Sequence, residues 1–170
     1  ASDVYKRQDN GTIYGCYIDC TKAFETVKYS ILFQKLLYAK IFPVIVRLII
    51  NMYLKQKANA RWEGKLSRQF NISNGVKQGT VLSPILFCFY MNNLFSIMKN
   101  NKTGCHVGNY FTGLFGYADD LFIISPSRKG LQEMVYVADK YAESHNINFS
   151  TNQYSVKNKP KAIILRSASY

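Results

Sequence analysis

The segment 115–124, FGYADDLFII, constrains the fold of this chain more than any other. Two adjacent carboxylates, Asp119 and Asp120, lie between two short apolar runs, each typical of a buried strand. The pair is therefore predicted at or near the turn of a β-hairpin. Because like charges repel, they must be solvated or neutralised, and a divalent cation such as Mg²⁺ is the usual neutraliser. An ordinary acidic turn is the alternative interpretation, since Asp is common in turns.

A second segment, CYIDCT at residues 16–21, predicts a strand whose side chains alternate between two faces. If Cys16, Ile18 and Cys20 face the core, Asp19 projects to the open side of the sheet. A cap or loop residue is the alternative for a lone Asp near a strand end. A site assembled from one strand and one hairpin is what a two-metal phosphoryl or nucleotidyl transferase needs.

The third segment, NGVKQGTVLSP at residues 74–84, predicts a loop followed by a helix over 84–98. Ser83 is the expected N-cap, with a proline at the first helical position. Gly75 and Gly79 would let a backbone approach a ligand closely. Taken alone, the segment also fits an ordinary loop before a helix.

In this order the three segments resemble the palm of a reverse transcriptase, and in particular the non-LTR (LINE-type) retrotransposon enzymes. DCTKAFE at 19–25 is similar to the first catalytic motif of that family, GVKQGTVLSP at 75–84 to the second, and YADD at 117–120 to the third. The segment around Trp62 resembles the short hairpin that precedes the second motif. The resemblance covers residues 11–165, which is nearly the whole chain.

The resemblance implies an RNA-directed DNA polymerase that transfers a nucleotide from a dNTP to a primer 3′-hydroxyl by two-metal chemistry. The expected partners are an RNA template, a DNA primer and a dNTP, and the expected cofactor is a pair of Mg²⁺ ions, with Mn²⁺ as a substitute. Asp19 and Asp119 are the expected metal ligands. Asp120 is expected to support the site rather than bind both ions.

The resemblance also implies a nucleotide pocket after the first motif. Phe24 matches the aromatic residue that blocks the 2′-hydroxyl of a ribonucleotide, although a core Phe is the alternative. The triphosphate is expected to rest on the backbone amides of four successive residues. These are Cys20, Thr21, Lys22 and Ala23.

Two further parts of the pocket follow from the resemblance. Gln78 and Gly79 match residues that shape the nucleotide and template pocket. A degenerate fourth motif contains Lys159, which would protonate the leaving pyrophosphate but precedes a proline where the family often has Thr. Lys157 and Lys161 are rival candidates, and a solvated run of lysines is the alternative.

Two departures from the family pattern bear on activity. Glu25 stands where the family usually has Asp, and the upstream fingers and downstream thumb are not recognised, so the isolated chain is expected to be an inactive fragment. A group II intron-type reverse transcriptase is the near alternative. A catalytically dead nucleic-acid-binding relic is the other, although the three intact aspartates argue against it.

The composition supports a folded, nucleic-acid-binding chain. Of 170 residues, 48% are hydrophobic, and 22 Lys and Arg against 10 Asp and Glu give a net charge of +12. Such an excess suits a polyanionic partner and predicts salt-sensitive binding, although a merely soluble basic protein also fits. The four cysteines show no zinc spacing, so they are interpreted as small core residues in a reducing compartment.

The expected fold class is α+β: a polymerase palm with a split βαβ (ferredoxin/RRM-like) antiparallel sheet, helices on one face and the other face open. Strands or hairpins are predicted at 12–20, 58–73, 110–125 and 162–166, and helices at 30–39, 44–55, 84–98 and 129–145. In the second helix, one apolar stripe is predicted to face the core. It consists of Ile45, Leu48, Ile49 and Met52.

Residues 9–170 are interpreted as the palm fragment. Residues 1–8 match a translated transposase mosaic end and are interpreted as a sequencing-library artefact, with a frayed terminus as the alternative. No signal peptide is visible, and the apolar run 41–54 is too short to span a bilayer. An intracellular location, nucleus or cytoplasm, is therefore expected, without secretion or membrane contact. The sequence leaves the oligomeric state open.

Overall fold

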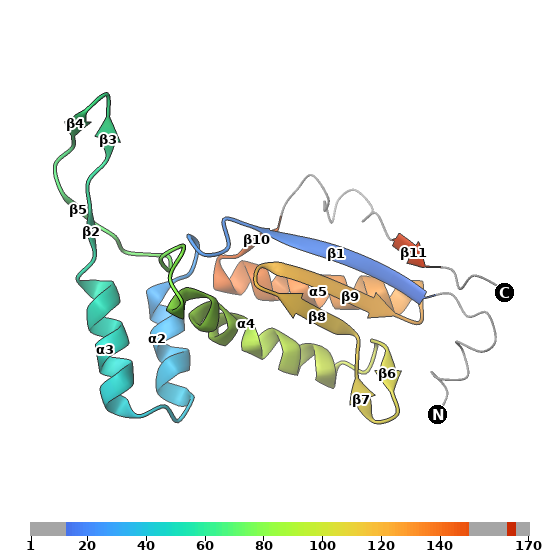
Figure 1. Cartoon of the computed structure of the whole chain (residues 1–170). Helices are drawn as coiled ribbons and strands as arrows, with labels where there is room; N and C mark the ends of the chain where they lie inside the picture. Colours follow the sequence, from blue (N-terminus) through green and yellow to red (C-terminus); the bar gives the residue numbers. More distant parts are fainter. Residues whose placement is uncertain (1–12, 150–162, 166–170) are drawn as a thin grey trace. The chain divides into compact units, whose positions relative to one another are not determined.

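The computed structural model describes residues 13–149 and the backbone of residues 163–165 (Figure 1). The chain divides into two compact units: Ala1–Ala23 with Met91–Tyr170, and Phe24–Tyr90. The expected domain at 9–170 therefore contains parts of both units. Residues 1–8 and the fourth motif lie outside the described residues.

The first unit is built on an antiparallel sheet with the strand order β10-β1-β9-β8, and β11 also pairs with β1 (Figure 1). Its strands are β1 (Ile13–Thr21), β8 (Leu114–Tyr117), β9 (Asp120–Ser125), β10 (Asn148–Phe149) and β11 (Ile163–Leu165). With α4 (Leu82–Asn100) between β1 and β8, and α5 (Arg128–His145) between β9 and β11, the split βαβ order is confirmed.

Alternation along β1 places its apolar side chains in the core. Cys16, Ile18 and Cys20 are buried, as predicted, and so are Leu121 and Ile123, which pair with Ile18 and Cys16 across β9. Directly paired residues of an antiparallel sheet share a face. This buried face packs against α5, which contacts both β1 and β9. The other face carries the charged residues of both strands.

The two longest helices, α4 and α5, begin differently. At α5, Ser127 Oγ accepts a hydrogen bond of 3.0 Å from the Gly130 amide, which is an N-cap interaction. For α4 the predicted Ser83 cap is wrong, because the helix already begins at Leu82. Ser83 is buried in its first turn, where its hydroxyl bonds the Thr80 hydroxyl at 2.7 Å instead of capping the backbone.

The second unit contains α2 (Tyr29–Tyr38), α3 (Pro43–Leu54) and four short strands. The strands are β2 (Lys57–Ala58), β3 (Arg61–Trp62), β4 (Lys65–Leu66) and β5 (Phe70–Asn71). β2 pairs with β5 and β3 with β4, which confirms the predicted hairpin. Its turn lies at Glu63 and Gly64, with φ of 46° and 79°, the backbone that a two-residue hairpin loop requires.

The predicted core stripe of α3 is wrong at three of its four positions. Ile45, Leu48 and Met52 are 45%, 61% and 50% exposed, and only Ile49 is buried. The stripe that does face the core consists of Val46, Ile49 and Tyr53. The helix sequence PVIVRLIINMYL is apolar around most of its circumference, so periodicity alone admits more than one stripe. Packing against α2 decides between them, with the Tyr53 ring 5.6 Å from the Tyr29 ring.

Two short pairings were not predicted. β6 (His106–Val107) pairs with β7 (Tyr110–Phe111), so the hairpin that carries the paired aspartates begins at Leu114 rather than near Tyr110. β10 pairs with the end of β1. Strands of two residues are too short to show a periodic pattern. Among the described helices, none combines the length and apolar character needed to cross a bilayer.

Candidate active site

Two carboxylates face each other between the two inner strands of the first unit's sheet, at the end of their ladder. Asp19 on β1 and Asp120 on β9 are direct partners in the antiparallel register, and both are half-buried. Directly opposite residues have Cβ atoms about 4.5–5.5 Å apart and point to the same face. Because the neighbouring Ile18 and Leu121 point into the core, this pair lies on the open face, where Asp19 was predicted.

The third carboxylate, Asp119, belongs to the turn between β8 and β9. Tyr117 pairs with Asp120, so Ala118 and Asp119 form a two-residue hairpin loop. Ala118 has φ of 52°, in the left-handed region that L-residues other than Gly avoid. Favoured two-residue loops require positive φ at this first position. The turn therefore holds Asp119 beside the paired carboxylates, at the predicted hairpin.

Tyr17 is a hydrogen-bond partner of this cluster. It lies two residues before Asp19 on the same face of β1, and its hydroxyl donates a hydrogen bond to Asp120 Oδ1. This bond, together with the negative charges of the three aspartates, raises the pKa of Tyr17 to about 12. Tyr17 thus stays protonated and orients one oxygen of Asp120.

The Cys20 thiol also responds to all three carboxylates. Burial raises its pKa to about 12, and the charges of Asp119, Asp19 and Asp120 add to that effect. The register of β1 and β9 sets Asp19 opposite Asp120, and Asp119 precedes Asp120 in the turn. The sheet therefore gathers the three predicted acidic residues into one small region.

This donor set fits a hard divalent cation. All its donors are carboxylate oxygens, and Mg²⁺ is commonly held by one or two carboxylates, with water and substrate phosphates completing its octahedron. Within the described residues, no group of three or more His, Cys, Asp or Glu side chains is arranged so that it could hold a metal ion by itself. Two of these carboxylates, with water and substrate phosphates, would be enough ligands for Mg²⁺.

The residues expected to cradle a triphosphate follow directly after Asp19. Cys20 and Ala23 are buried, whereas Thr21 and Lys22 are exposed. Lys22 has φ of 51° within a run of turn residues. A left-handed residue in such a run is a feature of the anion-binding concavities called nests, in which successive backbone amides point inward.

Within the second unit, the end of the first motif packs against the second motif. The Gly75 amide donates to the Val27 carbonyl at 2.8 Å, and the Val76 amide donates to the Phe24 carbonyl at 2.7 Å. A Cβ on Gly75 would lie 3.0 Å from the Glu25 carbonyl oxygen. Gly75 thus permits a close approach to the chain's own backbone, whereas the sequence had suggested approach to a ligand.

The other pocket residues of the second unit are more exposed. Phe24 is half-buried, with its ring centroid 5.1 Å from that of Phe87. Gln78 Nε2 donates a long hydrogen bond of 3.4 Å to Glu25 Oε1. Gly79 has φ of 75° and open space where a Cβ would lie. Lys159 and its rivals Lys157 and Lys161 lie outside the described residues.

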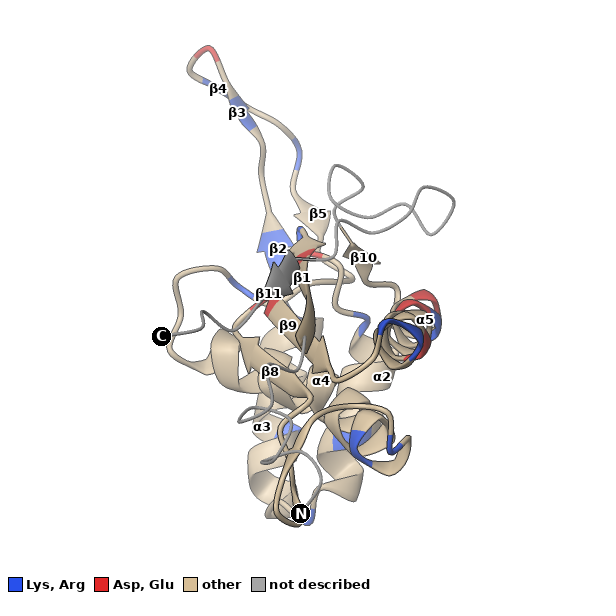
Figure 2. Ribbon diagram, turned by 90° about the vertical axis from the view of Figure 1, so that its right-hand side faces the viewer, with Lys and Arg blue, Asp and Glu red and all other residues tan. Residues whose placement is uncertain are grey.

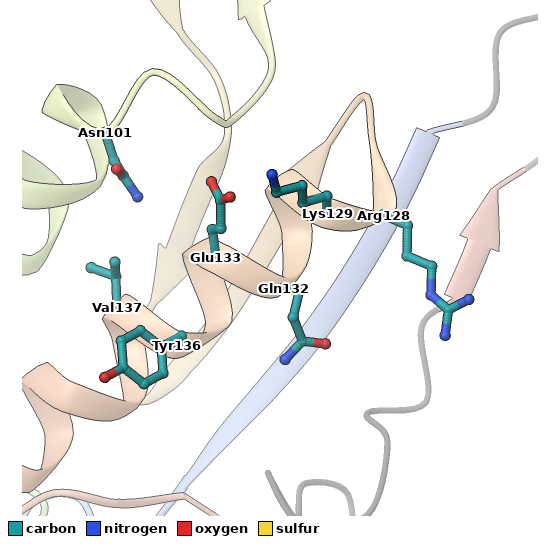
Figure 3. A pocket seen from close by; sticks show the side chains of 7 residues that line it. All are labelled: Asn101, Arg128, Lys129, Gln132, Glu133, Tyr136 and Val137. Carbon is teal, nitrogen blue, oxygen red and sulfur yellow. The ribbon is translucent and has the colours of Figure 1, made fainter.

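Sequence reasoning missed the role of Tyr17. Strand alternation alone puts Tyr17 on the face of Asp19, but its contact with Asp120 depends on the register between β1 and β9. A separate hollow of about 870 Å³ lies along the outer side of α5 (Figure 3). Its lining includes Arg128, Glu133 and Tyr136, and none of the three aspartates. It is therefore not part of the candidate site.

A family model described as reverse transcriptase (RNA-dependent DNA polymerase) matches residues 3–161. The chain belongs to the reverse transcriptase family. This confirms the resemblance drawn from the three motifs, and the fold agrees with it. The segments predicted as the first and third catalytic motifs lie at the carboxylate pair of β1 and β9 and at the turn between β8 and β9.

The relatives of this reverse transcriptase are proteins of non-LTR retrotransposons, as expected. It is 31% identical over 136 residues to the Pol polyprotein of the type-2 retrotransposable element R2DM of Drosophila melanogaster, covering 78% of this chain and 13% of that protein. It is 25% identical over 146 residues to the RNA-directed DNA polymerase of the mobile element jockey from the same species, covering 82% and 15%. The chain thus spans about an eighth to a seventh of these relatives.

Solved structures show the same fold. Apo telomerase of Candida tropicalis, truncated from its C-terminal domain, superposes with a TM-score of 0.67 at 13% identity, covering 99% of this chain and 34% of that one. Telomerase of Candida albicans in complex with a fragment of telomeric RNA gives a TM-score of 0.64 at 13% identity, covering 98% and 31%. The palm-type polymerase fold expected from the sequence is therefore confirmed.

Proposed function

We propose that this chain is the palm segment of an RNA-directed DNA polymerase, which extends a DNA primer on an RNA template with dNTPs. The observation that carries the proposal is the register of β1 and β9. It sets Asp19 opposite Asp120 on the open face of the sheet, with Asp119 in the adjoining turn. Clustered carboxylates on an open face would repel two polyanionic substrates by themselves, but with cations bound they would suit the joining of those substrates at one point.

In this proposal the three aspartates have different roles. Asp19 and Asp119 hold the cations, as the motifs imply, and Asp120 supports them through its fixed position opposite Asp19. The Tyr17 hydroxyl donates a hydrogen bond to Asp120 Oδ1 and so fixes the orientation of that carboxylate. When bound, a pair of Mg²⁺ ions, or Mn²⁺ in their place, supplies activation of the primer hydroxyl and stabilisation of the charge on the transferring phosphoryl group.

The residues after the first motif receive the incoming nucleotide in this proposal. The backbone amides of residues 20–23 bind the triphosphate, supported by the left-handed Lys22 in an exposed turn. The Phe24 ring excludes a ribose 2′-hydroxyl by steric contact, and its packing on Phe87 fixes the ring for that purpose. Gln78 and Gly79 shape the template side, and Lys159 gives a proton to pyrophosphate.

The test uses the complete polymerase that contains this segment, in primer extension on an RNA template. Asp119→Asn should lower extension by at least a hundredfold, because removing one carboxylate from a metal site removes both charge and coordination. Glu133→Gln on α5 is the matched control, since it removes one exposed negative charge away from the three aspartates and should leave extension unchanged.

Binding of template and primer, measured by fluorescence anisotropy, should change little in Asp119→Asn, because phosphate contacts lie elsewhere. More than about a tenth of the wild-type extension rate in this variant would contradict the assignment of the metal ligand. Complete absence of extension by the unmodified enzyme, with template and primer bound, would instead favour a catalytically dead nucleic-acid-binding protein.

A further inference from the structure

The hairpin of the second unit concentrates positive charge. Between β2 and β5, its two arms carry Lys57, Arg61, Lys65 and Arg68 against one carboxylate, Glu63. Figure 2 shows Lys and Arg along both arms and the acidic residue at the tip. Within the described part of the chain, none of these four cations lies within salt-bridge distance of a carboxylate. The charge is therefore available to an external anion.

The same hairpin exposes the only tryptophan of the sequence. Trp62 is 79% exposed and lies directly opposite Lys65 in the β3–β4 pair. A large aromatic ring left in water loses the benefit of burial, and an indole beside a cation and open to solvent is a typical stacking surface for a base. Arg61 lies on the other face of the ribbon, opposite Leu66, which is 70% exposed.

Hydrogen bonds below the turn hold the two arms in place. The Asn59 side chain donates to the Ser67 carbonyl at 2.9 Å, and Ser67 Oγ accepts from the Ala60 amide at 2.9 Å while it donates to the Arg68 carbonyl at 2.9 Å. The Ser67 amide also donates to the Ala60 carbonyl at 2.8 Å. The ring and its cations are therefore presented on a hairpin that is ordered before any ligand arrives, which lowers the entropy cost of binding.

We propose that the β3–β4 hairpin is a binding surface for single-stranded nucleic acid, with one base stacked on Trp62 and the adjacent phosphates paired with the Lys and Arg side chains. Cations combined with an exposed aromatic ring are how proteins bind single strands without sequence preference. Duplex bases are already paired and stacked, so they offer no free face to the indole. The inference deepens the proposed function and rests on it, because a polymerase must guide unpaired template.

Trp62 makes the proposal directly measurable in the 170-residue chain, since its fluorescence has no other tryptophan contribution. The chain is titrated with an unlabelled oligo(dT) of about 12 nucleotides, within the site sizes known for single-strand binders, and with a duplex of equal length. Stacking on a base should quench the emission with the single strand and leave it nearly unchanged with the duplex.

Variants then separate the contribution of base stacking to binding from that of positive charge. The affinity of each variant is measured by the fluorescence anisotropy of a labelled single strand. Trp62→Ala should weaken binding about 5- to 100-fold, and Trp62→Phe should restore most of the loss, because any aromatic face can stack. The double variant Arg61→Gln/Lys65→Gln should reduce the slope of log K against log salt by about 1.4, since each phosphate contact of a single strand contributes about 0.7.

Arg47→Gln is the matched control, because it removes one exposed cation from α3 of the same unit and should change affinity by less than about twofold. Absence of quenching by the single strand, equal quenching by the duplex, or wild-type affinity in Trp62→Ala would each overturn the proposal. None of these results depends on the aspartates. If the complete enzyme shows no primer extension, the binding results for the hairpin therefore remain valid. If the hairpin does not bind single strands, the primer-extension test of the proposed function is unaffected.

Discussion

At the scale of single residues, charge repulsion within the candidate site lowers the stability of the folded chain. Like charges directly opposite each other in an antiparallel sheet are destabilising, by about 0.2–1 kcal/mol per pair. Asp19 and Asp120 occupy such positions, and Asp119 adds a third negative charge in the next turn. Tyr17 offsets part of this by its hydrogen bond to Asp120. Nothing in the sheet itself requires three acids here, so their presence reflects chemistry rather than stability.

Asp19→Asn should therefore raise the stability of the metal-free chain, by about 0.5–1 kcal/mol, while it removes the proposed activity. The substitution keeps the size of the side chain and leaves the Tyr17–Asp120 hydrogen bond intact. Urea unfolding in EDTA measures the effect, with Glu133→Gln as a surface control expected to stay within about 0.5 kcal/mol of the wild type.

Repeating both melts in Mg²⁺ gives an independent check. A cation that binds only the folded state should stabilise the wild type as its concentration rises, and should stabilise Asp19→Asn less. A variant that is less stable than the wild type in EDTA would show that the paired carboxylates do not repel each other as the register implies.

At the scale of elements, the accuracy of the sequence predictions depended on how distinctive each pattern was. The helix predicted at 129–145 is α5, Arg128–His145, because its apolar residues form one narrow stripe. In α3 nearly every residue is apolar, so periodicity could not choose between Leu48 and Val46 as the core residue. Alternation predicted the open-side position of Asp19, and the flanking apolar runs predicted Asp119 and Asp120 at a hairpin turn. The pairing of Asp19 with Asp120 is set by a long-range register that no local pattern encodes.

The two glycines of the second motif show a different kind of local constraint. Both have positive φ, at 86° for Gly75 and 75° for Gly79, so an L-residue at either position costs about 1–2 kcal/mol. Only Gly75 also has backbone atoms, including the Glu25 carbonyl oxygen, at 3.0–3.2 Å from the place of a Cβ. Crowding against backbone adds about 1–3 kcal/mol, because backbone cannot rotate away as a side chain can.

Gly75→Ala should therefore lower the free energy of unfolding by about 2–4 kcal/mol, and Gly79→Ala by about 1–2 kcal/mol. Urea unfolding of the two variants beside the wild type measures the difference, and each variant serves as the control for the other. Equal losses would show that the contact between Gly75 and the first motif is not tight.

At the scale of the whole molecule, much of the surface of the second unit is apolar. Leu37, Tyr38, Phe42, Val44 and Leu48 are each at least 61% exposed, and all lie on α2, α3 or the loop between them. Exposed large apolar side chains lower solubility, and they favour association with other proteins where they adjoin one another. The net charge of +12 counteracts association by repulsion, so the isolated chain should become less soluble as salt screens that charge.

Neighbouring residues of α3 allow this surface to be tested. Leu48→Gln should leave stability within about 0.5 kcal/mol of the wild type and reduce aggregation in high salt, because Leu48 is 61% exposed. Ile49→Gln should cost about 2–4 kcal/mol, since Ile49 is 6% exposed and a buried amide without partners is unfavourable. Thermal melts measure the stability of both variants, and light scattering measures their aggregation. A larger loss of stability in Leu48→Gln than in Ile49→Gln would show that Leu48, and not Ile49, belongs to the core stripe.

The position of β1 inside the sheet should make it one of the last segments to open in local unfolding. β1 pairs with β9 along one edge and with β10 and β11 along the other, so it cannot separate without breaking several ladders at once. Segments with this many partners open only in the largest unfolding events, whereas hairpin tips fray often. Amide protons near Asp19 should therefore outlast those of the β3–β4 hairpin in deuterated water. The first carboxylate would then lie on the strand that opens most rarely, while the β3–β4 hairpin, which is ordered by its own cross-strand hydrogen bonds, would open in smaller and more frequent events.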